Sequence, residues 1–177
     1  MRETVMYRTP NKPILVTGGS GYVGSKLVPM LAQHAPVRVL ETMVFGNSIA
    51  GTPNVEFIQG DIRDLDILRQ VVQGVDTIIH LAGIVTDELV DINPDYAHSV
   101  NVRATHHLTN EGVSAGVERF IYASSSSVYG SQEEECHEGT KPSPQTAYAR
   151  MKLEGESIVN AWKDNLWVFS VRSATCC

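Results

Sequence analysis

The stretch from Thr17 to Gly24, Thr-Gly-Gly-Ser-Gly-Tyr-Val-Gly, constrains the fold of this chain more than any other. It follows the aliphatic run 14–16, which predicts a buried strand, and it leads into residues 25–31, whose apolar positions recur at helical spacing. Glycine permits a tight turn off a strand, close approach of backbone to a pyrophosphate, and close packing of helix on strand. The N–H groups of the first helical turn then face the phosphates. The stretch therefore predicts a dinucleotide-binding turn, and a glycine-rich turn without a ligand is the alternative.

The length and composition favour one globular domain in the cytoplasm. The chain has 177 residues, 42% of them hydrophobic and 19% charged, which is enough for a sizeable core. A net charge of -6 argues against binding to nucleic acid or anionic membranes, and no apolar run approaches a membrane span. Residues 1–12 are predicted to be a flexible leader, and residues 13–177 an NAD-binding domain. The three cysteines, at positions 136, 176 and 177, lack a metal-binding spacing and predict reduced thiols.

The remaining chain alternates predicted strands and helices. Alternation of this kind predicts an α/β Rossmann fold, a doubly wound parallel sheet in strand order 3-2-1-4-5-6 with a ligand at the strand C-termini. Residues 42–54 and 84–94 are predicted to be loops. A long helix is expected to start after Asn93-Pro94 and to carry Val100, Ala104, His107 and Leu108 on one face. The predicted strands are 14–16, 37–40, 55–59, 76–81, 119–123 and 166–171, and the predicted helices are 22–33, 65–73, 95–115 and 146–163.

Three positions at predicted strand ends suit a dinucleotide. Glu41 ends the second strand, where a carboxylate accepts hydrogen bonds from ribose hydroxyls and repels a 2′-phosphate, so NAD is favoured over NADP. Asp61 ends the third strand and could bond the adenine amino group, or it could cap a helix. The segment 81–83, Leu-Ala-Gly, ends the fourth strand, where small residues admit a cofactor or simply close a buried strand.

The pair Tyr148 and Lys152 is the clearest catalytic signal. Their spacing places both side chains on one helix face, although such a pair also arises by chance. A phenol has a pKa of about 10, so a tyrosine base needs nearby positive charge, which a lysine and an oxidised nicotinamide both supply. Lysine can also hold the nicotinamide ribose hydroxyls. The serines at 124–127 follow the fifth strand, where one hydroxyl could polarise a substrate and the others cap backbone.

Other polar groups are given no chemical role. His106 and His107 are neighbours on a helix, so their rings point to different faces. The segment 136–138, Cys-His-Glu, has no partner at ligand spacing, and residues 133–135 form a solvated acidic run. No metal site is predicted.

Taken together, these blocks resemble the extended short-chain dehydrogenases/reductases, specifically the NAD-dependent epimerase/dehydratase family. UDP-glucose 4-epimerase and dTDP-glucose 4,6-dehydratase are members. The resemblance runs from about residue 14 to residue 175. It implies that Ser125 is the catalytic hydroxyl, Tyr148 the base and Lys152 its partner. The cofactor residues that it implies are Gly18, Gly21, Tyr22, Val23 and Gly24 at the phosphates, Glu41 at the ribose, Asp61 and Ile62 at adenine, Leu81, Ala82 and Gly83 along the cofactor, and Tyr148 and Lys152.

The resemblance implies an NAD-dependent nucleotide-sugar epimerase or a related sugar-modifying enzyme. Such enzymes oxidise a sugar C4 hydroxyl with bound NAD and act on the keto-sugar before reducing it again. Three departures bear on the reaction: Val85 replaces a lysine found in some epimerases, Met151 stands where a Ser or Thr is common, and Ser126 and Ser127 stand where the dehydratases carry an acidic pair. The alternatives are an NAD-dependent ketone or steroid-like alcohol oxidoreductase and a non-catalytic NAD-binding protein.

Family members are usually longer. The resemblance therefore implies a chain truncated after the sixth strand, lacking the substrate domain and inactive by itself. A homodimer of the full-length form is left open.

Overall fold

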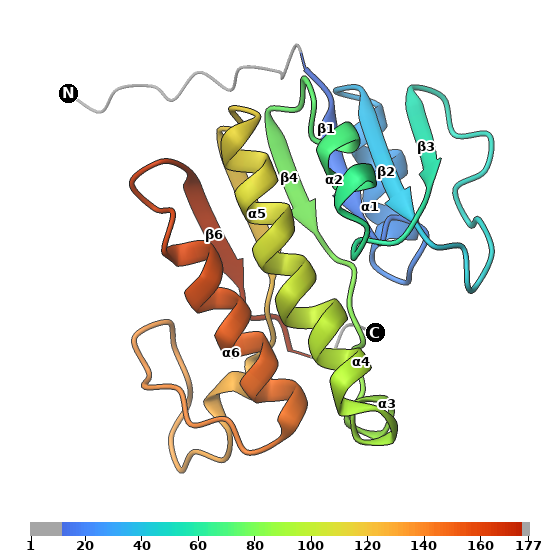
Figure 1. The fold of residues 1–177 in the computed structure, drawn as a ribbon. Coiled ribbons are helices and arrows are strands. Elements are labelled where there is room, and N and C mark those ends of the chain that lie inside the picture. The colour runs from blue at the N-terminus through green and yellow to red at the C-terminus, as the bar shows by residue number, and fades with distance from the viewer. Residues whose placement is uncertain (1–11, 175–177) are drawn as a thin grey trace.

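Six strands form one parallel sheet in the order β3-β2-β1-β4-β5-β6, which confirms the predicted fold class (Figure 1). The structure is a computed structural model that describes residues 12–174. The predicted leader therefore lies almost entirely outside the described residues, as do Cys176 and Cys177. The strands are β1 (Ile14–Thr17), β2 (Val37–Glu41), β3 (Val55–Gln59), β4 (Thr77–His80), β5 (Arg119–Ala123) and β6 (Trp167–Val171).

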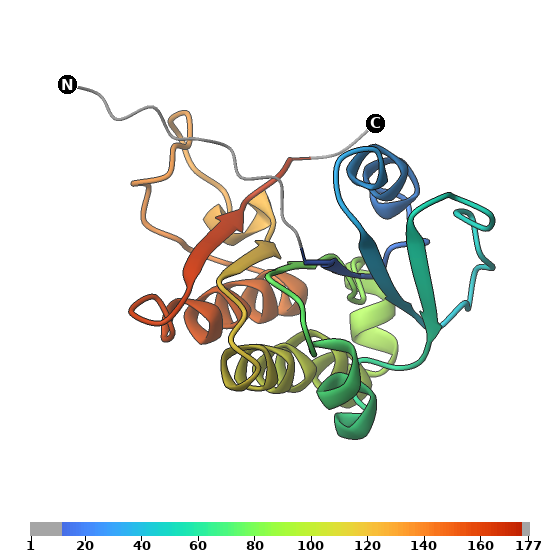
Figure 2. The same ribbon diagram turned by 90° about the horizontal axis from the view of Figure 1, so that it is seen from above.

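Helices cover the sheet on both faces. Viewed along the strands, α2, α5 and α6 lie on one face and α1 lies on the other, over β1 and β2 (Figure 2). This arrangement is the doubly wound architecture that alternating strands and helices predict. The helical elements are α1 (Gly24–Ala32), α2 (Leu65–Val71), α3 (Asp87–Ile92), α4 (Pro94–His98), the π-helix η1 (Ser99–Arg103), α5 (Ala104–Ser114), the 3-10 helix η2 (Ser126–Tyr129) and α6 (Ala147–Asn160).

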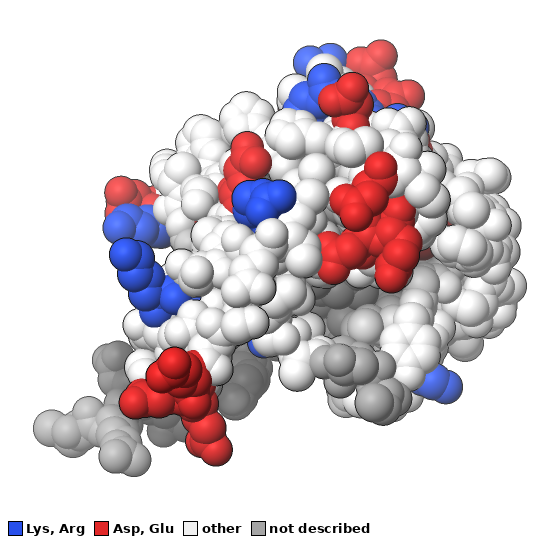
Figure 3. Space-filling view, turned by 90° about the horizontal axis from the view of Figure 1, so that it is seen from below, with Lys and Arg blue, Asp and Glu red and all other residues white. Residues whose placement is uncertain are grey.

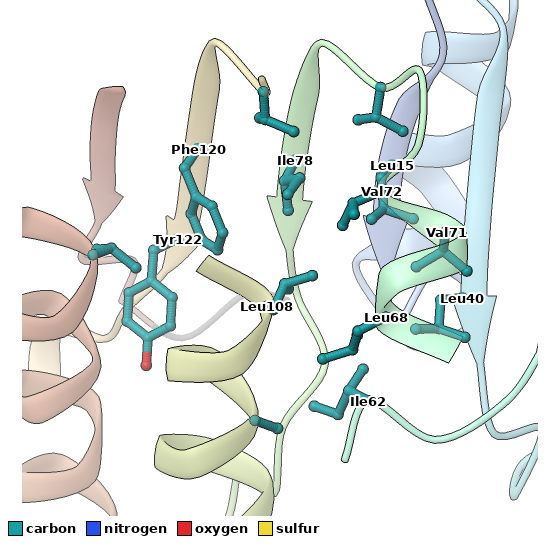
Figure 4. Close-up of a cluster of buried hydrophobic side chains, with 14 of the residues drawn as sticks. Leu15, Leu40, Ile62, Leu68, Val71, Val72, Ile78, Leu108, Phe120 and Tyr122 are labelled. Carbon is teal, nitrogen blue, oxygen red and sulfur yellow. The ribbon is translucent and has the colours of Figure 1, made fainter. Parts of the chain in front are cut away.

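The larger hydrophobic cluster lies between the sheet and helices α2 and α5 (Figure 4). Leu15 and Ile78 from neighbouring strands and Leu68 and Leu108 from the helices are fully buried in it. Full burial of a leucine side chain contributes roughly 1.5–3 kcal/mol relative to exposure. A second cluster packs α1 onto β1 and β2 through Val16, among others. Burial on both faces explains why the central strands β1 and β4 are buried at every position.

Two predicted segments differ from the structure. The segment 84–94 is not a loop throughout, because it contains α3, whose first turn is capped by the Thr86 hydroxyl accepting from Leu89 N. The long helix predicted over 95–115 is divided by η1, a turn of π-helix. On its predicted face, Val100, Ala104 and Leu108 are buried, but His107 is partly exposed. Val100, Ala104 and Leu108 thus keep one buried face through η1 and α5, and the prediction is wrong only for His107.

Because all strands are parallel, their C-terminal ends share one edge of the sheet. In register, Thr17 pairs with Leu40 on one side and His80 on the other, and His80 pairs with Tyr122. The segments that follow β1, β2, β4 and β5 therefore meet at this edge, which is where ligands bind in open α/β sheets. Figure 3 looks onto this edge and shows acidic side chains in several groups on it.

Candidate functional site

The glycine turn after β1 is held in a conformation that a side chain would prevent. Gly18 has φ +73°, and a Cβ there would lie 2.7 Å from the backbone nitrogen of Ala82. A Cβ at Gly24 would lie 2.5 Å from the carbonyl oxygen of Gly19. Gly21 is the least crowded of the three predicted glycines, since the nearest atom to its Cβ position is the Gly18 oxygen at 3.2 Å. The turn thus packs tightly against residues 81–82, which follow β4, whereas the Cβ position at Gly21 meets only the backbone of the turn itself.

Helix α1 starts at this turn without a capping side chain. Its N-cap residue, Val23, makes no side-chain hydrogen bond to the first turn, and the Tyr22 and Val23 side chains are exposed. The first N–H groups of a helix need acceptors and carry partial positive charge. The N–H groups of residues 25–27 already donate to Gly21 O and Val23 O, so a phosphate would accept from the N–H groups at 22–24, and this end of α1 fits the pyrophosphate of a dinucleotide.

Glu41, the last residue of β2, lies beside the same turn. One carboxylate oxygen accepts from Ser20 N at 3.2 Å, and the other accepts from Thr42 N at 2.9 Å. The negative charge is therefore fixed next to the glycine turn, where a 2′-phosphate would be repelled. Its contact with the ribose stays a prediction.

The structure gives Asp61 a partner within its own loop. Its carboxylate accepts from Arg63 N at 2.9 Å and from the Arg63 guanidinium, and this arginine holds the pKa of Asp61 below its usual range. The cap of α2 is Asp64, so the helix-capping alternative for Asp61 is wrong. The Ile62 side chain is buried in the larger core cluster. Contact of these residues with adenine stays a prediction, and for Ile62 it would involve the backbone.

The segment 81–83 follows β4 and lies near the middle of the sheet edge where the strands end. Leu81 N donates to Thr17 O at 3.1 Å, which joins the segment to the end of β1. A Cβ at Gly83 would lie 3.0 Å from Asn101 Oδ1 and 3.7 Å from Lys152 Nζ. The absence of a side chain at Gly83 thus leaves the space in front of Lys152 open.

Asn101 is a site residue that the sequence did not reveal. It lies in η1 and is buried, and its side-chain amide pairs with the backbone of Ile84, accepting from Ile84 N and donating to Ile84 O at 2.8 Å each. This pairing holds the segment after Gly83 against the helix. A single asparagine within a helical pattern carries no signal of such a contact.

His80 is fully buried behind this segment and carries no charge. Thr105 Oγ1 donates to Asn101 O, so it accepts from His80 Nε2, and His80 Nδ1 accepts from Thr17 Oγ1 at 2.6 Å. Burial lowers the pKa of His80 to about 3, with a smaller contribution from the charge of Lys152. His80 is therefore a neutral structural link between β1, β4 and α5.

Ser125, Tyr148 and Lys152 converge beyond the end of β5. Lys152 is 4% exposed, and its Nζ donates to Ala123 O at 2.8 Å and lies 5.8 Å from the centre of the Tyr148 ring. Burial lowers the pKa of Lys152 to about 8. The pKa of Tyr148 is raised, mainly by burial and also by the charge of Asp87 on α3, while a hydrogen bond with Ser125 opposes the rise.

The serine run divides into different roles. The Ser127 N–H and hydroxyl both donate to Ser125 Oγ, at 3.2 and 2.9 Å, so Ser125 acts as the donor in its hydrogen bond with Tyr148. The Ser124 hydroxyl donates to the buried carboxylate of Glu156. The lowering of the Tyr148 pKa by Ser125 agrees with the choice of Ser125 as the catalytic hydroxyl, and this role stays a prediction.

No metal centre is found in the part of the chain that the structure describes. Within residues 12–174, no group of three or more His, Cys, Asp or Glu side chains is placed to hold a metal ion. Cys136 and the acidic run 133–135 are exposed in the loop before α6. No helix among residues 12–174 has the length and apolar character needed to cross a membrane.

Comparison with known proteins supplies the context of this site. Residues 14–176 match the model of the NAD dependent epimerase/dehydratase family. The chain is 38% identical to the uncharacterized protein y4nG of Sinorhizobium fredii, covering 93% of this chain and 41% of that protein. It is 32% identical to the mouse dTDP-D-glucose 4,6-dehydratase, with coverages of 85% and 46%. A 3 beta-hydroxysteroid dehydrogenase/Delta 5-->4-isomerase of Mycobacterium tuberculosis is 39% identical, with coverages of 65% and 32%.

Two solved structures are similar to this fold over nearly the whole chain. MoeE5 in complex with UDP-glucuronic acid and NAD has a TM-score of 0.82 and 31% identity, covering 90% of this chain and 54% of MoeE5. The epimerase Mth375 of Methanothermobacter thermautotrophicus has a TM-score of 0.86 and 32% identity, with coverages of 93% and 52%. The chain thus spans about half the length of the relatives it matches.

Proposed function

Because the chain belongs to the NAD-dependent epimerase/dehydratase family, we propose that it forms the cofactor-binding part of an enzyme that epimerises a nucleotide sugar. The observation that carries this proposal is the convergence of Ser125, Tyr148 and Lys152 at the edge where the glycine turn also lies. A protein that only bound NAD would have no use for a tyrosine and serine pair beside a buried lysine. The other half of the relatives' length is then proposed to supply the substrate domain.

The described residues fit NAD. We propose that the turn from Gly18 to Gly24 holds the pyrophosphate, Glu41 the adenosine ribose, and the segments 61–62 and 81–83 the remaining surface. The crowding at Gly18 and Gly24, the uncapped start of α1 and the lack of a side chain at Gly83 beside Lys152 support this assignment. When bound, NAD supplies the oxidation of a sugar hydroxyl.

The proton steps fall to this chain's own residues. Ser125 redirects its hydroxyl hydrogen from Tyr148 to the substrate oxygen, and Tyr148 accepts the proton that the substrate hydroxyl loses. With its pKa raised by burial, Tyr148 is a neutral phenol near pH 7, so it needs added positive charge to act as a base. The Lys152 ammonium supplies such charge, and its remaining N–H groups can hold a ribose hydroxyl. A pKa of about 8 leaves most of Lys152 charged at pH 7.

An NAD-dependent ketone or alcohol oxidoreductase is the second candidate. The identity to a mycobacterial 3 beta-hydroxysteroid dehydrogenase favours it, and Ser126 and Ser127 argue against a dehydratase. The two candidates differ in net redox change: an epimerase returns its cofactor to the oxidised form, whereas an oxidoreductase accumulates NADH.

The test uses the 177-residue chain and a form extended to the length of the relatives. UDP-glucose conversion to UDP-galactose and absorbance at 340 nm are followed with added NAD. We expect weak NAD binding and no conversion by the 177-residue chain, because the proposed substrate domain is what would hold the substrate and exclude water. We expect conversion without net NADH in the extended form, lost in Tyr148→Phe while NAD stays bound. Conversion by the 177-residue chain would show that the substrate site is already complete, and wild-type rates in Tyr148→Phe would exclude the proposed base.

The homodimer and the cytoplasmic location stay predictions for the extended form. Gel filtration of that form measures the first of these.

A further inference from the structure

The segment that carries Ser125 is held on both sides by the end of β6. On one side, the Ser124 hydroxyl donates to Glu156, which is 4% exposed and also accepts from Arg172 Nε and a terminal guanidinium nitrogen at 2.8 and 2.7 Å. On the other side, Ser126 N donates to Ser173 O at 2.9 Å. Ser125 therefore lies between two anchored residues, and both anchors involve the pair Arg172-Ser173.

The same arginine also fixes the far end of the segment. Its guanidinium carbon lies 4.9 Å from the centre of the Tyr129 ring, over the last residue of η2. The α6 helix contributes a further hold one turn before Glu156, where Lys152 Nζ donates to Ala123 O. Positions 123, 124, 126 and 129 are thus tied to α6 or to the residues after β6, while Ser125 Oγ accepts from Ser127, which leaves its hydrogen for Tyr148.

We propose that Ser124, Glu156 and Arg172 form a positioning clamp that sets the Ser125 hydroxyl against the Tyr148 hydroxyl. Glu156 is a positioning residue that touches neither substrate nor cofactor in this arrangement. Its carboxylate joins three donors from two strand ends, and a buried charge with complete hydrogen bonding keeps one geometry, since any displacement leaves a polar group unpaired. The inference rests on the proposed function, in which Ser125 and Tyr148 act together.

The other edge of the sheet offers a matched control. Asp76 is 8% exposed, accepts from the Thr77 hydroxyl, and is bound by Arg119 at 3.0 Å through both oxygens. This cluster has the same three chemical groups as the clamp, but it lies where the strands begin. Variants of the two clusters lose equivalent interactions at different distances from Tyr148.

The experiment measures the Tyr148 pKa in the 177-residue chain. Tyrosine labelled with ¹³C at Cζ is titrated by NMR, and Tyr148→Phe assigns the resonance. Ser125→Ala removes the hydrogen bond itself, and Ser124→Ala removes only the link to the clamp. Thr77→Val is the matched control, and Ser124→Thr keeps the hydroxyl. The double variant Glu156→Gln/Arg172→Met removes both charges together, with Asp76→Asn/Arg119→Met as its control.

We expect Ser125→Ala, Ser124→Ala and the clamp double variant to raise the Tyr148 pKa by about one unit, because a hydrogen bond to the phenolate is lost or loosened. Ser124→Thr restores the wild-type value, and both control variants keep it. A wild-type pKa in Ser124→Ala together with a raised pKa in Ser125→Ala would overturn the clamp and leave the proposed function intact. No rise in Ser125→Ala would also overturn the clamp, since Ser125 would then not act on Tyr148, whereas the proposed function is tested by the conversion assay.

Discussion

Two clusters built from a carboxylate, a hydroxyl and an arginine lie at opposite edges of the sheet. Asp76 with Thr77 and Arg119 joins β4 to β5 where the strands begin. Glu156 with Ser124 and Arg172 joins β5, α6 and β6 where the strands end. Both carboxylates are buried and satisfied, so the local chemistry alone does not distinguish a structural cluster from one that serves a site.

The surroundings make the difference. At the edge where the strands begin, Gly74 and Gly116 adopt positive φ in open space, so glycine is favoured there only by the backbone conformation. At the edge where the strands end, Gly18 and Gly24 are crowded by backbone within 3 Å. That edge also holds a buried lysine and a buried histidine with lowered pKa values. Crowded glycines together with buried groups of shifted pKa therefore mark this edge as the functional one, because a stable fold by itself does not need them.

The largest expected difference between the edges concerns their glycines. Gly24→Ala places a Cβ 2.5 Å from the carbonyl oxygen of Gly19, and backbone cannot move aside as a side chain can. We expect a loss of about 4 kcal/mol in unfolding free energy, and loss of NAD binding. Gly116→Ala meets open space at φ +77° and should cost about 1 kcal/mol. Urea unfolding of both variants checks this, and equal losses would remove the contrast.

As the pH falls, the unfolding free energy of the chain should decrease first through His80, which lies at the edge where the strands end. Because His80 has a folded pKa of about 3, below that of the unfolded chain, unfolding takes up a proton once the pH falls below about 6.5. We expect a loss of about 3 kcal/mol between pH 6.5 and pH 4. The lowered pKa of Asp61 adds its own loss only near and below pH 3.8. In His80→Asn, unfolding free energy should be lower at pH 7 but nearly flat over this window, and an unchanged slope would contradict the assignment.

Burial of the Lys152 ammonium should lower the unfolding free energy of the chain. Its pKa of about 8 is below the unfolded value, so the unfolded chain binds more protons between about pH 8 and 10.5, and stability rises with pH there. Lys152→Met removes this rise and should gain about 2 kcal/mol at pH 7, after the lost hydrogen bond to Ala123 is counted. Lys26→Met, on the exposed surface of α1, is the control. Lower stability of Lys152→Met at pH 7 would show that burial of the ammonium is not unfavourable.

The smallest effect concerns the choice of cofactor. We expect NAD to bind at least tenfold more tightly than NADP, about 1.4 kcal/mol, because the Glu41 carboxylate is fixed beside the glycine turn. Glu41→Ala should lower the ratio of NAD affinity to NADP affinity, whereas Glu118→Ala, where the strands begin, should leave this ratio unchanged. Calorimetric titration with both cofactors measures this, and equal affinities in the wild type would exclude the role of Glu41.

Much of the fold could be predicted from short stretches of sequence. The glycine turn, the alternation of apolar runs with helical patterns and the resulting strand order are confirmed. Strand β3 and strand β5 have the predicted bounds, since both are apolar runs closed by turn residues. The spacing of Tyr148 and Lys152 placed both on one helix face. Each of these features depends on neighbours within a few residues, where backbone sterics and helical geometry act directly.

The tertiary structure alone decided how these pieces form a site. It added α3, the π-helical turn that presents Asn101, and the partners that give the four serines different roles. His80 is neutral because Thr17, 63 positions earlier, and Thr105, 25 positions later, bond its two nitrogens inside the core. Glu156 holds Ser124 across 32 positions. Sequence patterns carry the periodicity of one element at a time, whereas burial and hydrogen-bond partners depend on which elements the sheet brings together, and these set the pKa values and the geometry of the site.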